Sequence, residues 1–178
     1  MALSATIYKA NLSISDMDRG YYAEHALTIA QHPSETLERM MLRVAVFALH
    51  ASETLTFTKG LCADDEPEIW QKSYSDEIEL WLDLGEPDEK RLKKACGRAD
   101  AVWLYCYGGR AAEIWWQGMK GKSARFANLN VINIAPATLA GLVTLAERGM
   151  QLTATIQDGQ LWLSNGETTV LVEGERWQ

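Results

Sequence analysis

The stretch at 78–107 constrains the fold most, because it predicts a strand, a helix and a second strand in succession. Its first part, IELWLDL, is apolar at every second position, as a strand with one buried face is. The next part, 89–99, has apolar residues at helical spacing, and 101–107 is apolar on both faces. Strands of parallel sheets covered on both faces have such apolar runs, so we predict an α/β (mixed α+β) fold: a mixed sheet flanked by helices.

The flanking segments predict an N-terminal hairpin and a C-terminal β meander. Residues 3–15 and 21–31 are expected to be strands joined by a polar turn. Ser34 is expected to cap a helix that runs to about Ala51 and is buried on more than one side. The other expected elements are strands at 55–59 and 127–134, helices at 110–117 and from Pro136 to about Arg148, and two-residue turns at Asp158-Gly159 and Asn165-Gly166.

Length and composition predict one domain, 1–178, with a substantial core. The net charge of −7 argues against a general nucleic-acid coat and against anionic membranes, but it leaves room for a local basic patch. The first residues, MALSATIYKA, lack the regions of a signal peptide, and no run approaches the roughly 18 apolar residues of a membrane span. We therefore expect a cytoplasmic protein without membrane contact.

Several common reaction centres are not expected. Cys62, Cys96 and Cys106 are odd in number and widely spaced, which fits neither a disulfide framework nor a zinc knuckle. Cys62 has no histidine partner in sequence reach, so a thiol nucleophile is not expected. P-loop, GxGxxG and GxSxG motifs are missing from the sequence.

Carboxylates gather at two places in the sequence. The loop at 60–70, GLCADDEPEIW, carries four acidic residues around a proline and can simply be a solvated loop. Asp83 lies near the end of the strand IELWLDL, and Glu79 shares its face with Trp81 between them. Open sheets bind ligands at the carboxyl ends of their strands, which makes Asp83 a candidate site residue; the alternative is a solvent-exposed face.

A helix carboxylate and a group of basic residues complete the candidates. Glu38 opens an apolar helix stripe, so it either faces a cation or only favours the positive end of the helix dipole. A basic cluster follows Asp83 and is expected to be mainly the solvated side of a helix, with one member serving the site. Its residues are Lys90, Arg91, Lys93, Lys94 and Arg98. Lys120, Lys122 and Arg125 are candidates for a further phosphate-binding edge.

The chain resembles the YaeQ family of bacterial proteins in segments that run nearly from end to end. These segments are HPSETLERMMLR (32–43), GLCADDEPEIW (60–70), LWLDLGEPDEKRLKKA (80–95), AAEIWWQ (111–117), FANLNV (126–131) and TATIQDGQLWLS (153–164). The resemblance implies a compact variant of the PD-(D/E)XK nuclease-like fold, a mixed sheet flanked by helices.

The resemblance also implies roles for single residues. Asp65 resembles the aspartate of the PD element, and Asp83 resembles the acidic residue of the (D/E)XK element. The lysine of that element would fall at position 85, where this sequence has Gly85. A lysine from the following helix would then replace it, and the candidates are Lys90, Lys93 and Lys94. Glu38 resembles the additional helix carboxylate that many members have.

Two functions follow from the resemblance, and a third needs none of it. The first is Mg²⁺- or Mn²⁺-dependent hydrolysis of DNA or RNA, with Asp65, Asp83, Glu38 and Glu79 as metal ligands and a helix lysine orienting water. It predicts that Asp83→Ala keeps the fold but loses Mg²⁺ binding and cleavage. The second is a catalytically inactive nuclease-fold protein that binds nucleic acid or a protein partner, which the missing lysine and the acidic charge favour. The third is an interaction module without nucleic-acid contact.

Overall fold

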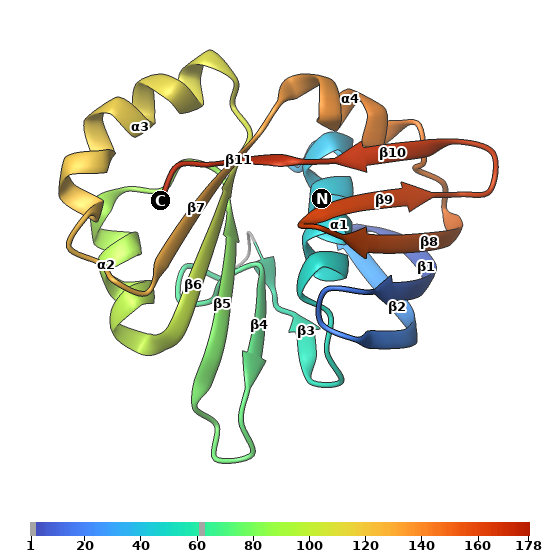
Figure 1. The fold of residues 1–178 in the computed structure, drawn as a ribbon, viewed down its shortest axis with the longest axis horizontal. Coiled ribbons are helices and arrows are strands. Elements are labelled where there is room, and N and C mark those ends of the chain that lie inside the picture. Colours follow the sequence, from blue (N-terminus) through green and yellow to red (C-terminus); the bar gives the residue numbers. More distant parts are fainter. Residues whose placement is uncertain (1–2, 61–62) are drawn as a thin grey trace. The chain divides into compact units, whose positions relative to one another are not determined.

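The computed structural model describes residues 3–60 and 63–178 (Figure 1). Leu61 and Cys62, and with them the expectation for the Cys62 thiol, lie outside the described residues. The described residues form eleven strands and four helices, in two compact units. The first unit comprises 1–52 and 137–173, and the second comprises 53–136 and 174–178. The mixed α/β class is confirmed, and the assignment of 1–178 to one domain stays a prediction.

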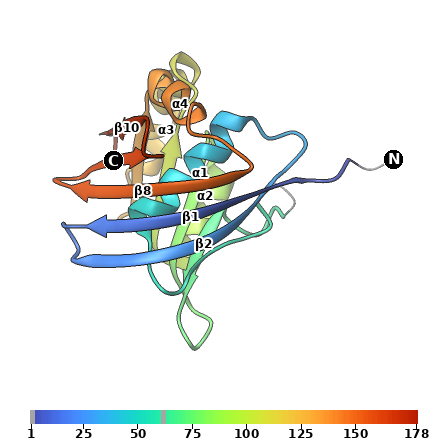
Figure 2. The same ribbon diagram turned by 90° about the vertical axis from the view of Figure 1, so that its right-hand side faces the viewer.

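The first unit is a five-stranded sheet with the order β10-β9-β8-β1-β2 (Figure 2). The predicted hairpin is confirmed as the antiparallel pair β1 and β2, and β8, β9 and β10 form the predicted meander. The meander joins the hairpin through a parallel pairing of β8 with β1. No local sequence pattern predicts this pairing. The elements are β1 (Thr6–Asp16), β2 (Tyr21–Gln31), α1 (Leu37–His50), α4 (Pro136–Val143), β8 (Gly149–Gln157), β9 (Gln160–Ser164) and β10 (Thr169–Val172).

Helix α1 begins two residues later than predicted. The prediction of Ser34 as its cap was wrong, because the side chain of Thr36 accepts the hydrogen bond from the Arg39 N–H at 3.2 Å. The Ser34 hydroxyl instead lies 2.6 Å from the ring nitrogen Nδ1 of His32. The expected burial on more than one side is confirmed, since every residue from Arg39 to Ala48 is buried.

Only one of the two predicted meander turns has the expected length. Asp158 and Gly159 have φ values of 54° and 74° and join β8 to β9 as a two-residue turn, as predicted. The prediction for Asn165-Gly166 was wrong, because β9 ends at Ser164 and pairs there with Thr169 across a longer loop. The Asn165 side-chain oxygen accepts hydrogen bonds from the N–H groups of Glu167 and Thr168, which stabilises that loop.

The second unit is a six-stranded mixed sheet with the order β11-β7-β6-β5-β4-β3. Strands β5, β6 and β7 are parallel, as predicted for the strand–helix–strand stretch, and the outer strands are antiparallel. The prediction missed β4, whose sequence IWQK has little alternation, and it ended α3 too early, before Gly118 and Gly121. The elements are β3 (Leu55–Phe57), β4 (Ile69–Lys72), β5 (Ile78–Leu84), α2 (Glu89–Arg98), β6 (Ala99–Cys106), α3 (Arg110–Ser123), β7 (Leu129–Ile134) and β11 (Gly174–Arg176).

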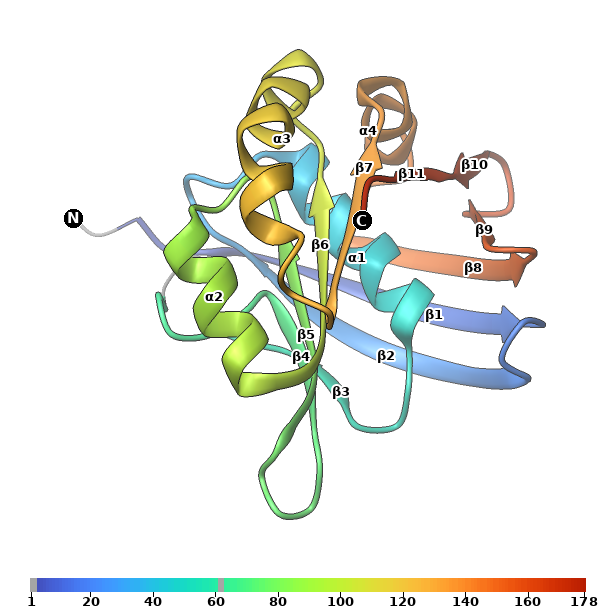
Figure 3. The ribbon, with the colours of Figure 1, turned by 60° about the vertical axis from the view of Figure 1, so that its left-hand side comes forward.

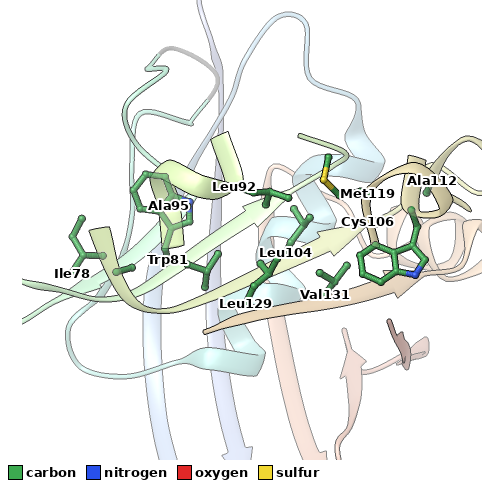
Figure 4. Close-up of a cluster of buried hydrophobic side chains, with 13 residues drawn as sticks. Ile78, Trp81, Leu92, Ala95, Leu104, Cys106, Ala112, Met119, Leu129 and Val131 are labelled. Carbon is green, nitrogen blue, oxygen red and sulfur yellow. The ribbon is translucent and has the colours of Figure 1, made fainter. Parts of the chain in front are cut away.

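Helices α2 and α3 lie side by side over one face of the parallel strands (Figure 3). Figure 4 shows the core between these helices and the strands. Trp81, Leu104 and Val131 come from successive strands, and Leu92 comes from α2. Asp83 follows Trp81 on the same face of β5, so this helix-covered face also carries the main candidate site residue. Among the described residues, none of the helices has the length and apolar content needed to cross a membrane.

Candidate functional site

Asp83 forms a two-point ion pair with Arg91 of α2. Only 4% of Asp83 is exposed. Its Oδ2 accepts a hydrogen bond from Arg91 Nε at 2.9 Å, and its Oδ1 accepts one from Arg91 Nη2 at 3.0 Å. Oδ2 also accepts a hydrogen bond from the indole N–H of Trp81 at 3.1 Å. Both oxygens of this buried carboxylate are therefore engaged, in the geometry that an arginine fork matches best.

The same arginine holds the acidic loop against α2. Arg91 Nη1 donates to the backbone oxygen of Asp64, and Nη2 donates to that of Glu66, each at 3.0 Å. Burial alone would lower the pKa of Arg91, but the hydrogen bonds and charge of Asp83, with the charges of Glu68 and Asp64, raise it above the ordinary value. Arg91 is thus a permanently charged group that links strand β5, helix α2 and the acidic loop.

Asp65 is paired with other residues of the same helix. Its carboxylate accepts a hydrogen bond from Lys94, and its backbone oxygen accepts one from Arg98 Nη1 at 2.6 Å. The hydrogen bond and charge of Lys94 lower the pKa of Asp65, with a smaller contribution from Arg98. Because Asp65 is exposed, this pairing is open to solvent and screened, unlike that of Asp83.

Within the second unit, the other predicted site residues do not converge on Asp83. Glu79 accepts a hydrogen bond from Gln71 at 2.6 Å, and it lies four residues from Asp83 along β5, about 13 Å at the rise of a strand. Lys90 and Lys93 are exposed on α2. Glu38 is exposed in the first turn of α1, which belongs to the first unit.

This arrangement does not fit a divalent metal ion. Mg²⁺ requires oxygen ligands that converge with near-octahedral geometry, whereas the carboxylates of Asp83 and Asp65 each point at a cationic side chain. Across 3–60 and 63–178, the described residues contain no group of three or more His, Cys, Asp or Glu side chains that could hold a metal ion. The predicted ligand roles of Asp65 and Asp83 would need their ion pairs with α2 to open first. The ligand roles of Glu38 and Glu79 stay predictions.

The backbone conformation at position 85 explains why a glycine, and not a lysine, stands there. Its φ is +103°, a conformation that residues with a side chain rarely adopt. This backbone lets β5 end and the chain turn toward Asp88, whose carboxylate caps α2 by accepting from the Arg91 N–H at 2.8 Å. The cap fixes the helix so that Arg91 meets Asp83.

Gly85→Ala is expected to lower the free energy of unfolding by about 1–3 kcal/mol, because alanine strains the backbone at this φ. Gly97 in α2 is the matched control, since an added Cβ there has no heavy atom within 4 Å. Gly97→Ala is expected to raise the stability by about 0.5–1 kcal/mol. Urea denaturation of both variants measures the difference, and equal effects would contradict the role given to Gly85.

Arg91 is the functional candidate that the lysine prediction missed. The prediction looked for a lysine because the resemblance expects one, and it counted Arg91 only as a member of the basic cluster. A sequence pattern could have found it: Arg91, Lys94 and Arg98 follow the spacing i, i+3, i+7 and therefore share one face of α2. In the structure that face carries every α2 side chain that contacts Asp83 or Asp65.

Curated relatives match the chain over its whole length. The family model of the YaeQ protein matches residues 1–174. The YaeQ proteins of Escherichia coli strain K12 and of Salmonella typhi are each 50% identical over 178 residues, which is 100% of this chain and 98% of each relative.

Solved structures of the same family have the same fold. The crystal structure of the YaeQ protein from Xanthomonas axonopodis pv. citri matches with a TM-score of 0.94 and 44% identity, over 98% of this chain and 99% of that chain. The YaeQ protein from Pseudomonas syringae matches with a TM-score of 0.93 and 30% identity, over 98% and 96%. The chain therefore belongs to the YaeQ family.

Proposed function

We propose that this protein binds nucleic acid on a nuclease-like scaffold without cleaving it. On a PD-(D/E)XK nuclease-like scaffold, which the sequence resemblance implies, Asp83 would correspond to the central acidic residue. The single observation that carries the proposal is the ion pair between Arg91 and Asp83, which occupies both oxygens of that carboxylate. A side chain held in this way stabilises the scaffold instead of binding a metal ion.

Helix α2 supplies the surface that supports binding. Lys94 and Arg98 are engaged with Asp65, whereas Lys90 and Lys93 are exposed on the helix. Exposed lysines attract phosphate groups as point charges, with an affinity that falls as salt increases. In a chain of net charge −7, such binding has to be local.

The expected result is binding of DNA or RNA in EDTA at low salt, with no cleavage when Mg²⁺ or Mn²⁺ is added. Lys90→Glu is expected to weaken binding about tenfold or more, because one phosphate contact is lost and one repulsive charge is added. Lys9→Glu, an exposed lysine of the first unit, changes the net charge equally and is the matched control. Fluorescence anisotropy with labelled oligonucleotides measures both, and equal weakening would reject α2 as the binding surface.

Metal-dependent nuclease activity is the second candidate. One observation favours it: Asp83 is ion-paired with Arg91, and the charges of Asp83, Glu68 and Asp64 raise the pKa of that arginine. A substrate that drew Arg91 away would leave these oxygens available. This candidate predicts that the native protein cuts nucleic acid with Mg²⁺ or Mn²⁺ and that Asp83→Asn does not, at equal amounts of folded protein. Uncut substrate under the same conditions would leave the binding proposal standing.

A further inference from the structure

The second unit has an open groove beside the C-terminal half of α3. The groove lies between the end of α3, the beginning of β7 and the segment that follows β11, and it encloses a volume of about 650 Å³. In Figure 1 the C-terminal label lies between the last turn of α3 and strand β7. We call it the α3–β7 groove; its lining residues are Trp116, Lys120, Gly121, Ala124, Phe126, Ala127, Leu129, Asn130, Arg176, Trp177 and Gln178.

Aromatic rings form one part of the groove. The indoles of Trp116 and Trp177 are stacked, with ring centroids 5.6 Å apart and an interplanar angle of 13°. Trp116 is buried in the core, whereas Trp177 and Phe126 pack against that core and are only half-buried. Flat aromatic surfaces of this kind accept an unstacked base, whatever its identity.

Cations form the other part. Lys120 and Arg176 line the groove and no acidic side chain does. Arg176 is held in place by a hydrogen bond from Nη2 to the side-chain oxygen of Asn130 at 2.6 Å and by its position 5.6 Å from the ring centroid of Trp103. A guanidinium has five N–H donors, so this contact leaves others for a ligand. The lining is thus positive although the chain carries a net charge of −7.

We propose that the α3–β7 groove binds single-stranded nucleic acid. Lys120 and Arg176 contact the phosphates, and the half-buried rings of Trp177 and Phe126 stack with bases. A duplex keeps its bases stacked inside and cannot use these rings, and an acidic peptide would use the cations alone. The inference rests on the proposed nucleic-acid binding and adds the strand state of the ligand and a second contact surface.

The groove is also connected to helix α2. Arg125 lies with its guanidinium 4.8 Å from the ring centroid of Phe126, and its Nη2 donates to Glu89 of α2 at 2.8 Å. Glu89 is in the first turn of α2, two residues before Arg91. This ion pair joins the segment that follows α3 to helix α2, which carries Lys90 and Lys93.

Lys120→Glu and Lys122→Glu test the groove as a matched pair. Both lysines are exposed on α3 and the two variants have the same net charge, but only Lys120 lines the groove. In EDTA and about 100 mM salt, Lys120→Glu is expected to weaken binding of a single-stranded oligonucleotide about tenfold and to lower the salt dependence by about one phosphate contact. Lys122→Glu is expected to weaken it less than about threefold.

Phe126→Leu tests the stacking contribution, with a thermal unfolding curve to verify that the variant is folded. It is expected to weaken single-strand binding and to leave duplex binding unchanged. Equal weakening by Lys120→Glu and Lys122→Glu, equal affinity for single strand and duplex, or equally effective competition by polyglutamate would overturn the inference while nucleic-acid binding itself stood. Cleavage with Mg²⁺ would overturn the non-hydrolytic function and leave the groove in place, and no binding to any nucleic acid would overturn both.

Discussion

Asp83→Ala is expected to lower the free energy of unfolding by about 2–4 kcal/mol. Breaking a buried ion pair costs about 3–5 kcal/mol, and the cost is reduced here because the side chain of Arg91 is 30% exposed. The variant leaves Arg91 without its carboxylate, and the indole N–H of Trp81 loses its acceptor as well. This replaces the expectation from sequence that Asp83→Ala keeps the fold unchanged.

Asp65→Ala is the control for this variant. Asp65 is also paired with a cation of α2, but its side chain is 79% exposed, so its removal is expected to leave the denaturation midpoint unchanged within error. A double-mutant cycle of Asp83→Ala with Arg91→Ala measures the coupling energy directly. A coupling energy near zero would show that the pair does not hold α2 on the sheet, and lost function in Asp83 variants could then be assigned to chemistry.

Glu35→Ala is expected to destabilise the protein by about 3–5 kcal/mol, because it removes the carboxylate that neutralises two buried guanidinium groups. Glu35 is 6% exposed, and its two carboxylate oxygens accept hydrogen bonds from Arg39 and Arg43 at 2.6 Å each. Arg43 also donates to the backbone oxygen of Ala30, so the cluster joins helix α1 to strand β2. Loss of Glu35 therefore weakens the attachment of α1 to its sheet.

Glu38→Ala is the matched control for Glu35→Ala. Glu38 lies three residues away and is exposed, so its removal is expected to change the free energy of unfolding by less than about 0.5 kcal/mol. Urea denaturation of the two variants under one set of conditions compares them. Similar midpoints for both would mean that the buried arginines find other partners when Glu35 is absent.

The parts of the fold that the sequence predicts are those with local causes. The strand–helix–strand stretch and the N-terminal hairpin follow from alternation, helical spacing and turn residues within a few positions. The pairing of β1 with β8 and that of β7 with β11 join segments far apart in the chain, and alternation says nothing about which strand is the neighbour. Strand β4 was missed because four residues are too few for a pattern.

The site was predicted in part for the same reason. Asp83 was identified from its strand position and Asp65 from the family resemblance, but the partner of each depends on the rotation of α2 about its axis. The Asp88 cap sets that rotation and brings Arg91 and Lys94 to the carboxylates, while Lys90 and Lys93 remain exposed. The family resemblance implies a lysine at this point, whereas the residue that contacts Asp83 is Arg91.

The chain order of the two units has a consequence for synthesis on the ribosome. The second unit is inserted between the two segments that build the first sheet, and a contact such as that of Arg148 with Ile7 spans 141 residues. Until β8 is synthesised, one edge of β1 therefore lacks its final neighbour, and an open strand edge is prone to pair with other chains. The nascent hairpin thus has to be kept from aggregating while most of the protein is still being made.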